Sequence, residues 1–170
     1  MVDRERMIEE FVELARIPSL SKREGAMAKA VIERLAAMGV EATTDRAGEA
    51  IGGEVGNVIA HVPATAEGLP CLLLNAHIDT VSPGEGIEPV VDGDIIYSAG
   101  ETITAADDKC GVVVLLETLR NILEQRLPHG GLDVVLTVAE EIGLQGAKNL
   151  DYGWITADMA YVLDGGEEAD

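Results

Sequence analysis

Four short polar motifs carry the residue types that bind divalent metal ions in proteins. They are His77-Ile78-Asp79, Asp107-Asp108, Glu140-Glu141 and Asp164. Imidazole and carboxylate groups without a thiolate are a ligand set that suits zinc, with manganese or cobalt as alternatives. The motifs contain no dense cluster of oxygen ligands, which argues against a calcium loop. The chemistry that this pattern favours is metal-assisted hydrolysis.

Each motif also has an ordinary structural explanation when it is taken singly. A His-x-Asp pair is more often a structural histidine beside a turn aspartate, and Asp107-Asp108 can cap the helix that follows. Asp164 can stand in a turn before Gly165-Gly166. Glu140-Glu141 can be a solvated acidic loop, but two carboxylates at the end of an apolar strand repel each other unless a cation or a proton compensates. The joint pattern therefore favours a metal site.

Three apolar runs predict strands that position these motifs. The runs cover residues 69–76, 132–139 and 160–163, and each delivers a polar motif at its carboxyl end. In open α/β sheets, ligands collect beyond the carboxyl ends of the strands. We therefore expect the polar side chains to converge at one edge of a sheet.

Helical periodicity predicts amphipathic helices over residues 3–16, 27–38 and 109–125. Ser21 followed by Glu24 matches a capping box for the second of these helices. Shorter strands are predicted over residues 40–44 and 57–62, which a glycine-rich turn would join, and over 94–97. Because strands and helices alternate, the predicted architecture is a three-layer α/β/α fold with a mostly parallel central sheet.

Length and composition set further limits. A chain of 170 residues predicts one core. The 31 acidic residues against 12 Lys and Arg give a net charge of -19, which disfavours nucleic acid as a partner. Cys71 and Cys110 lack the spacing of a thiolate zinc site, so we expect reduced core residues. We expect no membrane partner and a cytoplasmic location, because no apolar run approaches the ~20 residues of a span and no leader pattern is evident.

Longer motifs around the same residues resemble a known family. They are Asn75-Ala-His77-Ile-Asp79-Thr80-Val, Ala106-Asp107-Asp108-Lys109-Cys-Gly111, Thr137-Val-Ala-Glu140-Glu141-Ile-Gly143 and Val162-Leu-Asp164-Gly165. In this order they resemble the peptidase T-like branch of the dizinc aminoacylase and carboxypeptidase metallopeptidases, peptidase family M20. The resemblance extends over essentially the whole chain.

The resemblance implies a role for each motif. It implies that His77 and Asp164 ligate one zinc ion, that Glu141 ligates a second, and that Asp107 bridges the two. It also implies that Asp79 orients His77, that Glu140 is the general base, and that the Asp107-Asp108 peptide bond is cis. The implied reaction is hydrolysis of small peptides by a tripeptidase or aminopeptidase. Two alternatives stay open: a deacylase of N-acyl amino acids or a carboxypeptidase with the same site, and a non-catalytic metal-binding or interaction module.

The chain departs from the family in its length. Family members continue through a lid domain and back into the catalytic sheet, where a final histidine completes the second zinc site. Residues 1–170 therefore correspond to the N-terminal portion of the catalytic domain, with the lid or dimerisation domain and the C-terminal catalytic segment absent. His61 and His129 do not match the missing ligand and are expected to be structural. The departure implies weak binding of the second metal, doubtful activity of the truncated chain, and self-association through apolar surface left exposed by truncation.

Overall fold

The computed structural model describes residues 2–164, and within them five strands form a central sheet in the order β1-β2-β6-β3-β7. The strands are β1 (Ala42–Thr44), β2 (Val58–Val62), β6 (Leu132–Thr137), β3 (Leu72–His77) and β7 (Met159–Val162). β3 is parallel to both β6 and β7, whereas β2 is antiparallel to both β1 and β6. All the strands except β2 therefore run in the same direction, which confirms the predicted α/β class with a mostly parallel sheet.

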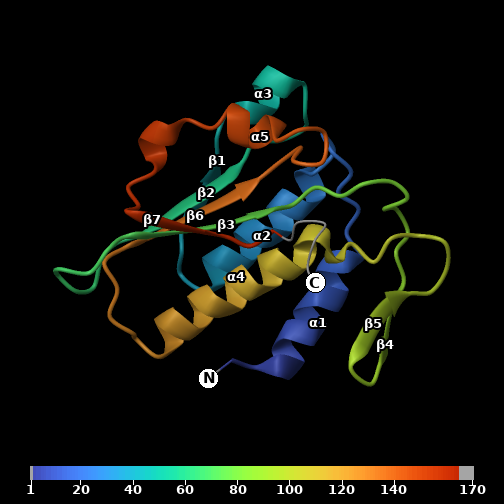
Figure 1. The fold of residues 1–170 in the computed structure, drawn as a ribbon, viewed down its shortest axis with the longest axis horizontal. Coiled ribbons are helices and arrows are strands. Elements are labelled where there is room, and N and C mark those ends of the chain that lie inside the picture. The colour runs from blue at the N-terminus through green and yellow to red at the C-terminus, as the bar shows by residue number, and fades with distance from the viewer. Residues whose placement is uncertain (1, 165–170) are drawn as a thin grey trace.

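Three helices cover one face of this sheet (Figure 1). They are α1 (Arg4–Ala15), α2 (Gly25–Ala37) and α4 (Ala106–Glu124), close to the three predicted helices. The core lies between these helices and the sheet, where apolar side chains of α4 such as Leu115, Leu116 and Leu119 are fully buried. On the opposite side, Figure 1 shows the short helices α3 (Ala47–Ile51) and α5 (Gln145–Lys148), which contact each other.

β6 lies at the centre of the sheet, and all six of its residues are buried. One of them is Asp133, whose carboxylate is satisfied by His61 Nδ1 at 2.7 Å and by the backbone N–H of Thr156 at 2.6 Å. A buried charged group needs such partners. His61 therefore has the structural environment that the sequence predicted for it.

The secondary structure differs from the prediction in several places, including α5 and the 3-10 helix Tyr152–Trp154, neither of which was predicted. The segment between β1 and β2 was predicted as a turn, but it contains α3. The strand predicted over residues 94–97 is β5 (Ile95–Ser98), and it pairs with a strand that the sequence analysis missed, β4 (Pro89–Asp92). Glycine and proline around residues 82–93 concealed β4, because those residues break the hydrophobic pattern.

The capping box predicted from Ser21 and Glu24 is wrong. α2 begins at Gly25, and the side chain of Glu24 makes no capping hydrogen bond. Ser21 Oγ instead donates to Asp79 Oδ2 at 2.6 Å, and Glu24 Oε1 accepts from the backbone N–H of Ala139 at 3.0 Å. Glu24 Oε1 also accepts from the backbone N–H of Lys22 at 2.7 Å, so neither side chain makes the pair of bonds that defines a capping box.

The two cysteines are free thiols, and Cys71 is buried as predicted. The prediction that Cys110 is also a core residue is wrong, because Cys110 is exposed. It lies one helical turn before Val114 and two before Thr118, and this stripe of α4 faces away from the core. Among residues 2–164, no helix combines the length and the apolar character that crossing a membrane requires.

Candidate metal centre

The ends of three neighbouring strands bring the predicted site residues together. β3 ends at His77, β6 is followed by Glu140 and Glu141, and β7 is followed by Asp164. Because β6, β3 and β7 are parallel neighbours, their carboxyl ends meet at one edge of the sheet. The start of α4 adds Asp107 at the same edge.

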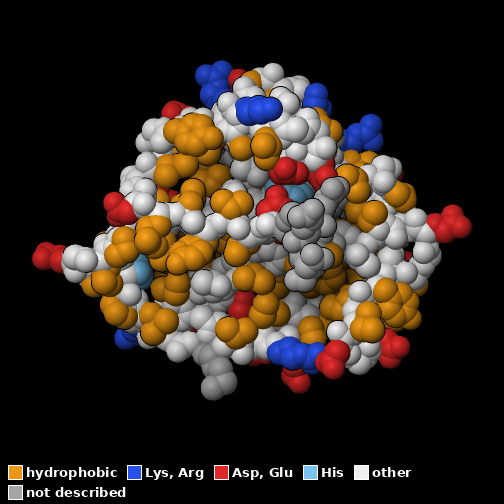
Figure 2. All heavy atoms as spheres, viewed as in Figure 1, with side chains coloured by type: hydrophobic (Ala, Val, Ile, Leu, Met, Phe, Trp, Pro, Cys, Tyr) orange, Lys and Arg blue, Asp and Glu red, His pale blue; other side chains and the backbone are white. Residues whose placement is uncertain are grey.

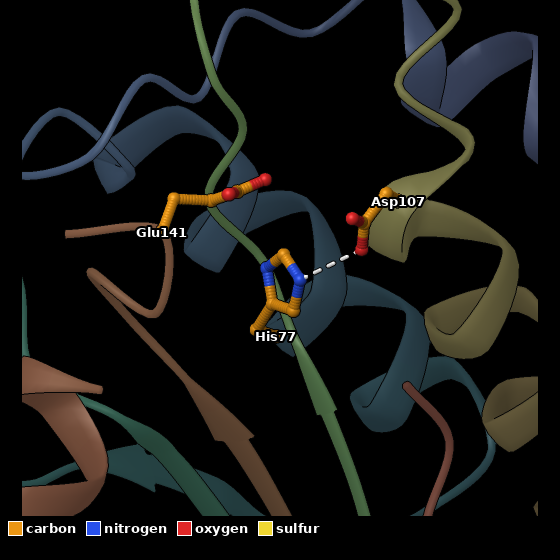
Figure 3. A group of neighbouring side chains, drawn as sticks. All are labelled: His77, Asp107 and Glu141. Atoms are coloured by element: carbon orange, nitrogen blue, oxygen red, sulfur yellow. Dashed lines mark hydrogen bonds and ion pairs between the residues drawn. The ribbon is translucent and has the colours of Figure 1, made fainter. Parts of the chain in front are cut away.

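Two groups of side chains in this cluster have the spacing of a metal site. One group is His77, Asp107 and Glu141, and the other is His77, Glu140 and Asp164; within each group the potential ligand atoms lie within 4.8 Å of one another. Figure 3 shows the first group, with the ring of His77 between the carboxylates of Glu141 and Asp107. His77 Nε2 lies 3.0 Å from Asp107 Oδ1 and 4.0 Å from Glu140 Oε2.

The orientation of the His77 ring is fixed from its other nitrogen. Nδ1 lies 3.0 Å from the backbone carbonyl oxygen of Asp79 and 3.5 Å from Asp79 Oδ1. Since a carbonyl oxygen can only accept a hydrogen bond, Nδ1 must carry a proton. In the neutral ring, the lone pair is therefore on Nε2, the nitrogen that faces the carboxylates.

Asp79 is fully buried, and its carboxylate has several donors. Oδ1 accepts from the backbone N–H of Glu140 at 2.8 Å, and Oδ2 accepts from the N–H of Glu141 at 3.2 Å and from Ser21 Oγ at 2.6 Å. Burial by itself would raise the pKa of Asp79, but the hydrogen bonds with His77 and Ser21 outweigh it and lower the pKa. Asp79 is therefore an anion that contacts both His77 and the glutamate pair.

The two aspartates before α4 differ in their orientation. Both have non-helical backbone angles, and the peptide bond between them is cis, as the family resemblance implied. Asp108 is 5% exposed and accepts hydrogen bonds from the backbone N–H groups of His77 and Gly111 at 3.1 and 3.0 Å. The side chain of Asp107 is 66% exposed and faces His77. Asp108 therefore accepts a hydrogen bond from a backbone N–H of the helix, while Asp107 is available to bind a metal ion.

The electrostatics of the cluster favour a bound cation. Burial raises the pKa of Glu140 and Glu141, and it raises the pKa of Asp108 to about 7. Burial would lower the pKa of His77, but hydrogen bonding and charge interaction with Asp79 outweigh it and raise the pKa to about 9. The cluster thus retains protons, since its negative charges are close together and partly desolvated. A divalent cation can replace these protons, so the residues present fit such an ion.

The sequence pattern does not indicate the contacts that Ser21 makes with Asp79 and Asp108 with the backbone of His77. Ser21 contacts Asp79 across 58 residues of sequence, and no local spacing indicates such a contact. His61 and His129 belong to neither potential ligand group in the part of the chain that the structure describes.

The fold and the cluster together give an α/β domain with potential metal ligands gathered at one edge of its sheet. The sequence profile of the family described as peptidase family M28 matches residues 57–164, which is more than half of the chain. The chain therefore belongs to this family of peptidases.

Solved structures of peptidases are similar to the chain over almost its whole length. It is 39% identical to aminopeptidase PepT from Bacillus cereus, with a TM-score of 0.92 over 96% of this chain and 44% of that one. It is 37% identical to a tripeptidase from Staphylococcus aureus, also with a TM-score of 0.92, over 98% of this chain and 44% of that one. A metallo-carboxypeptidase described as a member of the M20 family shares the fold at 19% identity and a TM-score of 0.70.

Among curated relatives, peptidase T of Escherichia coli is 30% identical over 66% of this chain and 36% of its own length. The chain spans less than half the length of the relatives that it matches. The similarity to peptidase T and to the solved aminopeptidase and tripeptidase confirms the expectation of a peptidase T-like metallopeptidase.

Proposed function

We propose that the chain is the N-terminal part of the catalytic domain of a zinc-dependent peptidase of the M20 type, which hydrolyses amide bonds of small peptides as an aminopeptidase or tripeptidase. The observation that carries the proposal is the convergence of five potential ligand side chains at one sheet edge: His77, Asp107, Glu140, Glu141 and Asp164. The similarity to an aminopeptidase, a tripeptidase and peptidase T supports the same substrate class.

We assign the potential ligands to two ions. His77 and Asp164 would hold the first ion, Glu141 would hold the second, and Asp107 would be shared between them. Zinc suits this set of nitrogen and oxygen donors, and manganese or cobalt are substitutes. When bound, such a pair of ions lowers the pKa of a water molecule and polarises the carbonyl group of the substrate.

The remaining residues would handle protons and orientation. Glu140 is placed beside the ligands, with Oε2 4.0 Å from His77 Nε2, and its raised pKa suits a group that takes a proton and then releases it. We assign it as the general base, which takes a proton from water and passes it to the leaving amine nitrogen. Asp79 keeps His77 Nε2 directed at the site, because it holds the proton on Nδ1.

We also propose that residues 1–170 correspond to the N-terminal portion of a catalytic domain, and that a lid or dimerisation domain, a C-terminal catalytic segment and a histidine ligand of the second ion would lie outside these residues. The difference in length between this chain and its relatives supports this view. We further propose that exposed apolar side chains of β7 allow self-association.

The test measures metal content and peptide hydrolysis on the same samples. The protein used is the full-length product of the gene that encodes this chain. We expect zinc binding and release of a residue from tripeptides. Glu140→Ala should keep the zinc and lose turnover by about 10²- to 10⁴-fold, the usual contribution of a general base. Glu67→Ala, which changes an exposed loop residue, is the matched control.

The outcomes separate the competing functions. If Glu140→Ala kept its turnover, the assignment of the base would be wrong. Zinc binding without hydrolysis would favour a non-catalytic metal-binding module. Preference for N-acyl amino acids or for C-terminal residues would favour the deacylase or carboxypeptidase alternative. Absence of zinc binding would leave a plain α/β domain.

A further inference from the structure

Four successive backbone N–H groups beyond the end of β6 are held by side chains instead of by a neighbouring strand. β6 ends at Thr137, and the N–H groups in question belong to residues 138–141, which include Glu140 and Glu141. The acceptors, in chain order, are Asn57 Oδ1 at 3.1 Å, Glu24 Oε1 at 3.0 Å, Asp79 Oδ1 at 2.8 Å and Asp79 Oδ2 at 3.2 Å.

The three side chains that supply these acceptors come from distant parts of the sequence and are all 0% exposed. Glu24 precedes α2, Asn57 precedes β2, and Asp79 follows β3. Hydrogen bonds from N–H groups to carboxylates are among the stronger ones, and they strengthen further when water is excluded. The segment that presents the two glutamates is therefore fixed by buried bonds.

The backbone at this segment requires such support. Ala139 has φ 52°, a left-handed conformation that is uncommon for a residue with a Cβ atom, and its side chain is fully buried. Strained conformations of this kind persist only where the surroundings impose them. The N–H of Ala139 is the donor to Glu24, so this bond acts on the residue where the chain turns away from the strand.

Asn57 extends the support to the far side of the turn. Its Nδ2 donates to the carbonyl oxygen of Gly146 at 2.9 Å and to Asp45 Oδ2 at 2.7 Å, while its Oδ1 accepts from Val138. A Cβ atom at Gly146 would overlap the carbonyl oxygen of Val138 and the side chain of Asn57. The two ends of the turn are thus packed directly against each other and tied by one amide side chain.

Glu24 makes one local hydrogen bond, in which its Oε1 accepts from the backbone N–H of Lys22 at 2.7 Å. It does not cap α2, and its second carboxylate oxygen, Oε2, has no hydrogen-bond partner within residues 2–164. A buried carboxylate is unfavourable unless it makes compensating interactions. The interaction that Glu24 makes outside its own segment is the one with Ala139.

We propose that Glu24 and Asn57 are positioning residues for Glu140 and Glu141. They act together with Asp79, which links the same turn to His77, so the imidazole and the two glutamates are held relative to one another by one set of buried bonds. The consequence for function rests on the proposed metal site, because Glu141 is a proposed ligand and Glu140 the proposed base. The consequence for backbone structure is independent of it.

The first test measures amide hydrogen exchange by NMR in the metal-free protein. Glu24→Ala should raise exchange at residues 139–141 by about ten- to a hundredfold, since a bond to a buried charged acceptor is lost, and leave β3 and α4 unchanged. Glu24→Gln, which keeps a carbonyl oxygen for the N–H of Ala139, should restore most of the protection. Glu33→Ala, on the exposed face of α2, is the matched control.

The second test measures zinc affinity and the visible spectrum of the cobalt-loaded protein. Glu24→Ala should weaken zinc binding by about 10- to 100-fold, the usual effect of removing a group that supports a ligand, and should alter the cobalt spectrum. Glu24→Gln should remain close to wild type in both. If Glu24→Ala does not fold, Glu24→Asp retains the charge but withdraws the acceptor, and the same measurements apply.

Two results would overturn the proposal. One is unchanged exchange at residues 139–141 in the folded Glu24→Ala or Glu24→Asp protein. The other is equal loss of protection throughout β3 and α4, which would show that Glu24 has only a general role in stability. If the exchange results are as expected but the wild-type protein binds no zinc, the positioning of the turn stands and the proposed metal function fails.

Discussion

At the scale of single residues, His77 is the basic side chain that the carboxylates of the site surround. Its Nδ1 faces Asp79, and its Nε2 faces Asp107 and Glu140. The surrounding carboxylates raise its pKa to about 9 despite burial. The protonated imidazolium therefore compensates part of the negative charge of these carboxylates. A metal ion at Nε2 must therefore displace a proton.

This displacement predicts a specific pH dependence of metal binding. Because the ring is protonated below pH 9, we expect the apparent zinc affinity to rise with pH by up to about tenfold per unit between pH 6.5 and 9. Calorimetry in buffers of different ionisation enthalpy should detect about one released proton at pH 7.5. His77→Gln should strongly reduce the dependence, and His61→Gln should not. A zinc affinity that is flat over this range would contradict the assignment of His77 as a ligand.

The residues that the sequence predicts as metal ligands lie close together in the structure, but the sequence does not indicate the residues that support them. His77, Asp107 and Glu141 belong to short motifs whose residue types are informative where they stand. Ser21 and Glu24 were interpreted as a capping box because their spacing fits one, but both side chains bond to residues of other elements. Spacing along the chain cannot reveal a partner that only the folded chain brings close.

At the scale of elements, α1 and α4 are joined by a buried lysine. Lys109 is 0% exposed, and its Nζ donates to the carbonyl oxygens of Leu14 at 3.1 Å and Ile17 at 2.6 Å, at the C-terminal end of α1. A cation is favourable there, because the last carbonyl groups of a helix carry partial negative charge. Burial lowers the pKa of Lys109 to about 8. This lysine follows Asp107-Asp108 directly, so it also fixes the position where α4 begins.

Replacement of this lysine by an apolar residue tests the connection. Lys109→Met should reduce the free energy of unfolding by about 1–3 kcal/mol at neutral pH, because buried carbonyl groups lose a donor. Since the pKa of Lys109 lies below its unfolded value of 10.5, the wild-type protein should gain stability relative to the variant as pH rises from 8 to 10.5.

Urea denaturation at several pH values measures both effects. Lys29→Met, at a site where the lysine side chain is 75% exposed, is the control and should change stability little. Equal stability of Lys109→Met and the wild-type protein at pH 7 would show that the two helices do not depend on this contact.

At the scale of the whole molecule, one edge of the sheet presents apolar side chains to solvent. β7 pairs with β3 on one side and has no second neighbour among residues 2–164. Its residues Met159, Tyr161 and Val162 are each more than half exposed. Figure 2 shows hydrophobic side chains gathered on the same face, in the region where Figure 1 places β7. An exposed apolar edge strand invites pairing with another chain.

We therefore expect the 170-residue chain to self-associate through β7. The net charge of -19 opposes association, so added salt should promote it by screening. Tyr161→Lys should weaken association, because a charged side chain on an edge strand disfavours pairing. Val91→Lys, on the exposed face of the β4–β5 hairpin, is the control. Sedimentation that shows only monomer at high salt would exclude this edge as an interface.

The sequence by itself determined the fold class, most of the elements and a set of candidate metal ligands, because hydrophobic periodicity and residue type are local properties. Only the tertiary structure decided that Asp108 accepts from the backbone of His77, which nitrogen of His77 is available, and which buried side chains hold the turn at residues 138–141. Those features depend on hydrogen bonds between residues far apart in the chain. They exist only when the strands lie side by side and exclude water from between them.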